Sequence, residues 1–255
     1  MASALHGKFT WYELTTPDPE AAERFYGAVL GWTARDANVP GMRYSLLSAN
    51  GSDIAGMMAP MQGAPSTWIG YVAVDDIDAA AEHLQKTGGQ TVMPVSPIPG
   101  VGRFTIALDP QQAAFALIEY APEFTKPSVP AKGIQGHGWW RELHTSHHDD
   151  AFAFYRDQFG WEEKDRMDMG PMGIYQIFGI DEEMGMGGMF NDGRKPPHWL
   201  FYFWIDDIDD TQGKIVSGGG AVVNGPMEVP GGAWIIEATD PQGVTFAVVG
   251  DRKKN

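Results

Sequence analysis

Two stretches of the sequence, WYELTTPDPEAAERFYGAVLGW (residues 11–32) and WRELHTSHHDDAFAFYRDQFGW (residues 140–161), are versions of one motif. Aligned without a gap, they share nine identical residues over 22 positions. Each begins as a strand-like run of aromatic and β-branched residues and continues with apolar residues at helical spacing. A Gly-Trp pair closes both. The fold of this chain is therefore expected to be one unit used twice.

The repeat extends through the rest of the chain. A shift of 131 residues places WIGYVAVDDID (68–78) on WLFYFWIDDID (199–209), and the Asp-Pro-Gln at 109–111 on that at 240–242. The segment between the copies is rich in Pro and Lys, as linkers are. We predict a first domain over 1–121, a linker over 122–133, a second domain over 134–250 and a tail over 251–255.

Composition restricts the possible partners. Hydrophobic residues make up 43% and charged residues 20% of the 255 residues, which is typical of a globular protein. The formal net charge of −15 disfavours nucleic acid and anionic membranes as partners. With no cysteine, the chain has no disulfide or thiolate site. No stretch is apolar enough for a signal peptide or a membrane span, so we expect a soluble, cytoplasmic protein.

Local signals give the order of elements within each copy. Asp18 is expected to cap a helix that has Pro19 at its first position and Gly31 after its end. Asp78 is expected to cap the next helix. In the second copy Ser146 is expected to cap the helix in a capping box with Asp149, which leaves the adjacent histidines on the surface. The pattern is strand, helix and three strands, repeated twice per domain.

The Met-rich stretch over 167–190 is expected to form meander strands with mobile loops. Its alternative interpretation is a plastic lid, because methionine adapts to irregular shapes.

Five stretches recur in order over almost the whole chain: AERFYGAVLGW, AFYRDQFGW, VDDIDAAAEHLQKTGG, ALDPQQAAFALIE and ATDPQGVTFAVV. In these stretches the chain resembles the vicinal-oxygen-chelate superfamily, which includes glyoxalases, bleomycin-resistance proteins and extradiol dioxygenases. The tandem form looks like the actinobacterial glyoxalase-like "hydroxylase" or 30-kDa antigen proteins. The resemblance implies an α+β fold of two tandem domains, each with two βαβββ modules that curl an antiparallel sheet into a cup for the ligand.

The resemblance also implies where a metal would be held. Metal-using members place a His or Gln on the first strand of a module and a Glu on its last strand. Carried over by register, the positions in this chain hold indole, alkyl and methyl groups, which cannot bind such an ion. We therefore expect no metal and no other cofactor. The positions are Trp11, Ile69 and Ala116 in the first copy and Trp140, Leu200 and Ala247 in the second.

Alternation along the first strand of each module sorts the side chains that face the cup. Candidate acid–base residues are Glu13, Glu142 and His144, because a carboxylate among aromatic rings is desolvated and suited to proton transfer. A structural Glu bonded to a neighbouring strand or to a Tyr hydroxyl is an equally good interpretation. The candidate ligand-binding residues are Trp11, Thr15, Ile69, Tyr71, Trp140, Leu200, Tyr202 and Trp204.

Three hypotheses for the function follow. The first is a metal-independent enzyme that acts on a small apolar or aromatic oxygenated molecule by Glu acid–base chemistry, in lyase, isomerase or hydroxylase-like reactions. The second is a binding protein that sequesters a drug or other small molecule. The third is a metal enzyme with atypical ligands. The only partner expected besides the ligand is a second copy, since the chain is either a monomer with an internal pseudo-dimer or a homodimer.

Overall fold

The computed structural model describes residues 3–61, 63–125, 133–181, 185–193 and 196–253. Most of the predicted linker (126–132), part of the Met-rich stretch (182–184) and the end of the tail (254–255) lie outside the described residues. No helix in the described part is long and apolar enough to cross a membrane.

The first domain contains two helices and nine strands in its described residues, and the βαβββ order is confirmed, with one short extra strand, β7. The elements are β1 (Phe9–Thr15), α1 (Pro19–Leu30), β2 (Thr33–Asp36), β3 (Tyr44–Ala49), β4 (Ser52–Met58), β5 (Thr67–Ala73), α2 (Ile77–Lys86), β6 (Gln90–Thr91), β7 (Ser96–Ile98), β8 (Gly102–Leu108) and β9 (Ala114–Tyr120).

The second domain repeats the order. Its elements are β10 (Gly138–Thr145), α3 (His148–Phe159), β11 (Glu162–Asp168), the 3₁₀ turn η1 (Gly170–Met172), β12 (Ile174–Gly179), β13 (Gly187–Asn191), β14 (His198–Ile205), α4 (Ile208–Ser217), β15 (Ala221–Glu228), β16 (Trp234–Thr239) and β17 (Thr245–Gly250). The strands predicted in the Met-rich stretch are β12 and β13. The turn η1 connects β11 to β12.

Each domain builds one curved sheet, as expected, but the sheets are mixed and not purely antiparallel. The strand orders are β2-β3-β4-β1-β5-β9-β8-β6 and β11-β12-β13-β10-β14-β17-β16-β15. The first strand of each module pairs in parallel with the last strand of the same module, as β1 does with β4 and β10 with β13. The reason is that the helix returns the chain to the edge where the module began, so the last strand runs in the same direction as the first.

The helix α1 begins and ends as predicted. The Asp18 carboxylate accepts a hydrogen bond from the N–H of Ala21, Pro19 stands in the first turn, and Gly31 closes the helix in the left-handed conformation at φ 75°. For α2 the predicted cap is wrong by two residues. Asp76 is the N-cap, and its side chain accepts from Ala79 N–H. Asp78 lies in the first turn, where it pairs with Arg103 instead.

The predicted capping box of α3 is also wrong. The N-cap is His147, which makes no side-chain cap bond, and Ser146 is exposed. The carboxamide oxygen of Asn191, on β13, accepts the N–H of His148 at 2.7 Å and so serves as the cap from a neighbouring strand. This contact buries His148, which the sequence placed on the surface. His147 is exposed as expected.

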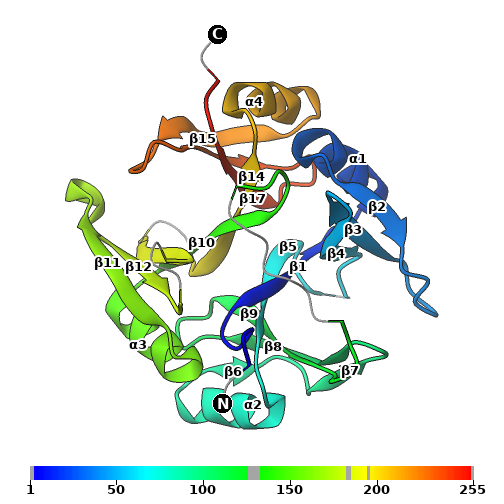
Figure 1. The fold of residues 1–255 in the computed structure, drawn as a ribbon, viewed down its shortest axis with the longest axis vertical. Coiled ribbons are helices and arrows are strands. Elements are labelled where there is room, and N and C mark those ends of the chain that lie inside the picture. The colour runs from blue at the N-terminus through cyan, green and yellow to red at the C-terminus, as the bar shows by residue number, and fades with distance from the viewer. Residues whose placement is uncertain (1–2, 62, 126–132, 182–184, 194–195, 254–255) are drawn as a thin grey trace. The chain divides into compact units, whose positions relative to one another are not determined.

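Contacts between Cα atoms group the chain into two compact units, and each unit takes parts from both tandem domains. The first unit contains Met1–Thr10, Ile69–Val129 and Arg141–Trp199. The second contains Trp11–Trp68, Pro130–Trp140 and Leu200–Asn255. Helices α2 and α3 contact each other in the first unit, and α1 and α4 do so in the second, where they lie side by side (Figure 1).

Residues of the repeated motif (11–32 and 140–161) make buried contacts within each unit. In the first unit the hydroxyl of Tyr155, on α3, donates to the carboxylate of Asp109 at 3.1 Å and accepts from the indole N–H of Trp199. Trp161 stacks on Tyr155 with ring centroids 5.0 Å apart. The second unit repeats these contacts with Tyr26, Asp240, Trp68 and Trp32. The Tyr and the Gly-Trp of the motif are therefore core residues.

Candidate functional site

Glu142 is the centre of a hydrogen-bonded cluster in the first unit. It lies on β10 opposite Gly188 of β13, and only 9% of the residue is exposed. The hydroxyl of Tyr175, on β12, donates to its Oε2 at 2.8 Å. Nε2 of His144 lies 2.9 Å from its Oε1. Both carboxylate oxygens therefore have partners, and the predicted pair of Glu142 and His144 is in direct contact.

Asp192 extends this cluster. Its Oδ2 lies 2.9 Å from Nδ1 of His144, and its side chain is 2% exposed. The imidazole of His198, at the start of β14, stacks on His144 with centroids 4.5 Å apart and an interplanar angle of 28°. The ring of Phe190 packs edge-on against His144 at 4.7 Å. His144 is thus held between two carboxylates within an aromatic setting.

A glycine makes room for the tyrosine. The ring of Tyr175 crosses the backbone of Gly188, and a Cβ added there would overlap the ring and its hydroxyl. Because Gly188 is directly opposite Glu142 in the ladder, the ring passes over the glycine and its hydroxyl reaches the carboxylate. The glycine at this position is therefore required by close approach of a side chain.

The second unit contains the first-domain version of the same arrangement. The hydroxyl of Tyr44 donates to Oε2 of Glu13 at 3.0 Å and accepts from the indole N–H of Trp11 at 3.3 Å. Gly56 faces Glu13 in the ladder, and a Cβ added to it would overlap the Tyr44 hydroxyl. Burial and, secondarily, the Glu13 carboxylate raise the pKa of Tyr44 well above its usual value of 10.0, so the phenol stays protonated.

The histidines have no counterpart in the first domain. Thr15 occupies the position of His144, and Thr67 that of His198. The hydroxyl of Thr15 accepts the N–H of Thr67 at 3.1 Å and donates to the carbonyl of Pro65. The Tyr–Glu pair is thus common to both domains, whereas the histidine cluster belongs to the second.

The remaining predicted residues form an apolar surface in the second unit and a separate contact in the first. Leu200 and Tyr202 are buried in a cluster with Ala247 and Val249. Three partly buried tryptophans, at positions 139, 140 and 204, pack against that cluster, and the rings of Trp139 and Trp204 lie 4.6 Å apart. In the first unit Tyr71 stacks on Phe104 at 6.1 Å, and Ile69 is 8% exposed. The Leu200 cluster therefore lies in a different unit from Glu142, and Tyr71 lies in a different unit from Glu13.

Sequence reasoning missed six residues of these clusters. Tyr44 and Tyr175 are identical at the 131-residue shift, so a signal existed for them. Gly56 and Gly188 correspond through their pairing with Glu13 and Glu142, because the same shift places Gly56 on Gly187. Asp192 and His198 had none, because neither has a like residue in the first copy.

The residues at the family's metal positions do not fit a metal ion. Trp140 and Leu200 supply no donor atom, and both ring nitrogens of His144 already face carboxylate oxygens. In the part of the chain that the structure describes, no three His, Asp or Glu side chains are placed to hold an ion. No chemical step is therefore assigned to a metal.

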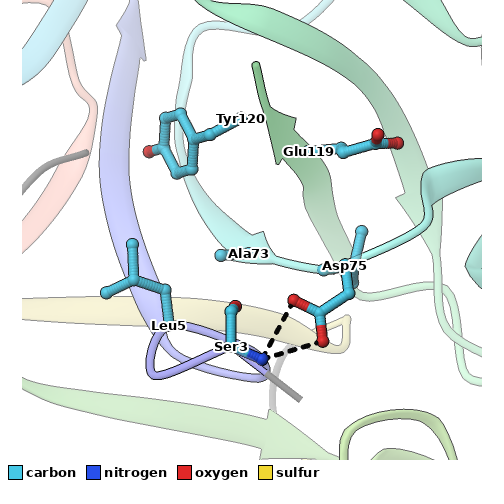
Figure 2. Close-up of a pocket in the computed structure, with 7 residues that line it drawn as sticks. Ser3, Leu5, Ala73, Asp75, Glu119 and Tyr120 are labelled. Carbon is cyan, nitrogen blue, oxygen red and sulfur yellow. Dashed lines mark hydrogen bonds between the residues drawn. The ribbon is translucent and has the colours of Figure 1, made fainter. Parts of the chain in front are cut away.

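A small pocket lies elsewhere in the first unit. It is lined by the N-terminal residues Ser3 and Leu5 together with Asp75, Glu119 and Tyr120 (Figure 2). The backbone N–H of Ser3 donates to the carboxylate of Asp75 at 3.0 Å and ties the N-terminal segment down. None of the predicted site residues lines this pocket.

The family model of the Glyoxalase/Bleomycin resistance protein/Dioxygenase superfamily matches residues 8–117 and 141–248. Over 252 residues the chain is 34% identical to the putative glyoxylase CFP32 of Mycobacterium tuberculosis (strain CDC 1551 / Oshkosh), with 95% of this chain and 94% of that protein covered. It is 29% identical over 262 residues to the anthracycline biosynthesis protein DauV of Streptomyces sp. (strain C5), with 95% and 93% covered.

Solved structures share the fold. The Mn(II)-bound glyoxalase from Novosphingobium aromaticivorans matches with a TM-score of 0.68 at 16% identity, over 99% of this chain and 84% of that one. Homoprotocatechuate 2,3-dioxygenase from Arthrobacter globiformis matches with a TM-score of 0.70 at 13% identity, over 96% and 80%. At such identities the likeness concerns the fold alone.

Proposed function

Because the chain belongs to the glyoxalase, bleomycin resistance protein and dioxygenase superfamily, we propose that it binds a small aromatic, oxygenated molecule and moves a proton on it without a metal. The observation that carries the proposal is Glu142, a nearly buried carboxylate whose two oxygens are held by Tyr175 and His144. A carboxylate fixed in this way needs no reorganisation before it accepts a proton. The reaction class is isomerisation or elimination that begins with proton abstraction next to a carbonyl.

The aromatic character of the ligand has separate support. Trp140 packs, with two other partly buried tryptophans, against the buried Leu200 cluster of the second unit. Partly buried tryptophans offer flat apolar surface at low entropic cost, which suits planar rings. Two relatives are named as anthracycline biosynthesis proteins, which agrees with an aromatic ligand.

The proton-transfer function is tested by hydrogen–deuterium exchange. Aromatic hydroxyketones and quinones are incubated with the protein in D₂O, and loss of the exchangeable C–H signal is followed by NMR. Glu142→Gln keeps the shape of the side chain and is expected to lower the exchange rate by about 10²-fold or more. Full exchange by Glu142→Gln on a substrate turned over by the unsubstituted protein would show that Glu142 is not the base.

A non-catalytic binder is the second candidate. It is favoured by Glu13, whose carboxylate is held by Tyr44 in a domain without the histidines. This hydrogen bond satisfies a nearly buried carboxylate and does not by itself indicate a catalytic role for Glu13. Saturable quenching of tryptophan fluorescence by the same compounds, with no deuterium exchange and no change on Glu142→Gln, is the result expected of a binder.

A further inference from the structure

His144 presents a problem of proton accounting. Its Nδ1 lies 2.9 Å from Asp192 and its Nε2 lies 2.9 Å from Glu142. A neutral imidazole has one N–H and one lone pair, so it can donate to only one of two ionised carboxylates. The other nitrogen would then direct its lone pair at a negatively charged oxygen. Two protons must therefore be shared by the three groups, and the ring binds both carboxylates when it is an imidazolium.

The contacts with two carboxylates support the imidazolium form, whereas burial by itself would favour a neutral ring. His144 is 3% and Asp192 is 4% exposed, and a buried charge is tolerated only when it is paired and hydrogen-bonded. A second cation stacked on His144 would be repelled, so His198 is assigned as neutral. In the neutral ring, Nδ1–H of His198 donates to the carbonyl of Pro196 at 2.9 Å, which fixes its tautomer.

We propose that Asp192 is a positioning residue for Glu142: it fixes His144 as an imidazolium, and this makes the second domain alone the acid–base site. The catalytic part of this inference rests on the proposed function. With His144 saturated by protons, the ring cannot take up a substrate proton itself, so Glu142 is the group that does. Proton uptake by Glu142 neutralises a carboxylate that is already nearly buried and hydrogen-bonded, so it creates no new buried charge.

The first domain cannot form this arrangement. Its Glu13 has the tyrosine partner, but Thr15 and Thr67 replace the two histidines. The ladder registers place Pro60 where the second domain has Asp192, because Thr15 pairs with Met58 and His144 with Phe190. Glu13 therefore has no histidine in the position from which His144 contacts Glu142, and we assign it a structural role in place of the acid–base role predicted from the sequence.

The protonation state is tested directly, without any substrate. The full chain is labelled with ¹⁵N-histidine, and the ring nitrogens are followed by NMR between pH 6 and 9, with signals assigned by His144→Gln. Both nitrogens of His144 are expected to carry protons across this range. In Asp192→Asn the ring is expected to lose one proton within the range. Asp149→Asn, an exposed carboxylate on the next helix, is the matched control and should leave the His144 signals unchanged.

Two outcomes would overturn the assignment of the ring. One is a neutral His144 in the unsubstituted protein, which would mean that Glu142 or Asp192 holds the second proton. The other is an Asp192→Asn variant in which His144 still keeps both ring protons between pH 6 and 9. Neither outcome depends on turnover, so the protonation assignment can fail while the proposed function stands, and the reverse is also possible.

The consequence for catalysis is tested on a substrate found by deuterium exchange. Asp192→Asn is expected to lower kcat with little change in KM and to shift the pH profile of kcat. Glu13→Gln is expected to lose far less exchange than Glu142→Gln, and the exposed control Asp149→Asn is expected to leave kcat and KM unchanged. An unshifted pH profile in Asp192→Asn, or an equal loss of exchange in Glu13→Gln and Glu142→Gln, would overturn the assignment of the site to the second domain.

Discussion

Glu13 and Glu142 each accept a hydrogen bond from a tyrosine whose ring lies over a glycine of the neighbouring strand. The bond keeps a nearly buried carboxylate satisfied, and the glycine provides the space that the ring occupies. The carboxylate, the tyrosine ring and the glycine therefore depend on one another. A substitution at any one of the three is expected to change the contacts of the other two.

Substitution of the glycine tests this unit. In Gly188→Ala the new Cβ overlaps the Tyr175 ring, which must move away from Glu142. We expect a loss of about 1–3 kcal/mol in the free energy of unfolding, measured in urea. Gly193→Ala is the control, because nothing lies within 4 Å of its added Cβ, and its effect should stay within about 0.5 kcal/mol. Equal unfolding curves for the two variants would contradict the close approach.

At the scale of elements, α3 begins differently from the other three described helices. The helices α1, α2 and α4 have an Asp at the N-cap whose side chain accepts a backbone N–H, whereas α3 has none. Its first N–H is bound by Asn191 of β13, and the carboxamide of Gln111 accepts the N–H groups of Ser146 and His147. The start of α3 is therefore fixed by tertiary contacts, next to the strand that leads to Asp192.

A pair of alanine variants separates the two ways of capping α3. Asn191→Ala removes the acceptor for His148 N–H and is expected to lower the free energy of unfolding by about 1 kcal/mol. Ser146→Ala removes an exposed hydroxyl that makes no cap bond and is expected to change it by less than about 0.5 kcal/mol. Thermal or urea unfolding that ranks them in the opposite order would restore Ser146 as the cap.

At the scale of the molecule, the tandem domains are joined within each compact unit by buried hydrogen bonds. Asp109 of the first domain binds Tyr155 of the second, and Asp240 of the second binds Tyr26 of the first. Burial raises the pKa of Asp109 and of Asp240 above the usual 3.8, against the hydrogen bonds that lower it. Burial likewise raises the pKa of Tyr155 far above 10.0, so the phenol remains a donor.

The raised pKa of Asp109 determines how its contribution to the free energy of unfolding changes with pH. The folded protein binds the proton more tightly than the unfolded chain, so the contribution of Asp109 is greatest below pH 3.8 and falls as pH rises through its folded pKa. Asp109→Asn removes this titration, and its stability relative to the unsubstituted protein is expected to improve as pH rises. Urea unfolding at several pH values measures the difference.

The contrasting variant is Asp149→Asn. Arg166 lowers the pKa of Asp149 by a hydrogen bond, so the contribution of this carboxylate is present above its usual pKa and is lost as pH falls. Its stability difference should therefore have the opposite slope, and a small one, because the pair is exposed. A slope of the same sign in both variants would contradict the burial of Asp109.

The sequence by itself determined the repeat, the α+β class and the order of elements, because these depend on periodicity, caps and turns that are local in the chain. The Asp18 cap, the closing Gly31 and the four βαβββ modules all follow from such signals. It also placed Glu142 and His144 on one strand face, since alternation is a property of the extended backbone. The tyrosine that contacts Glu142 was visible only as an unexplained identity between the copies.

Only the tertiary structure decided what those side chains contact. Asp192 and His198 lie 48 and 54 positions from His144 in the chain, and neither spacing marks them as neighbours. They meet His144 because β13 pairs in parallel with β10 and the next strand begins beside it. The same pairing brings Asn191 to α3 and buries His148. Long-range strand pairing therefore gives the three nearby histidines different environments. His144 is held between two carboxylates, His148 is buried at the start of α3, and His147 is exposed.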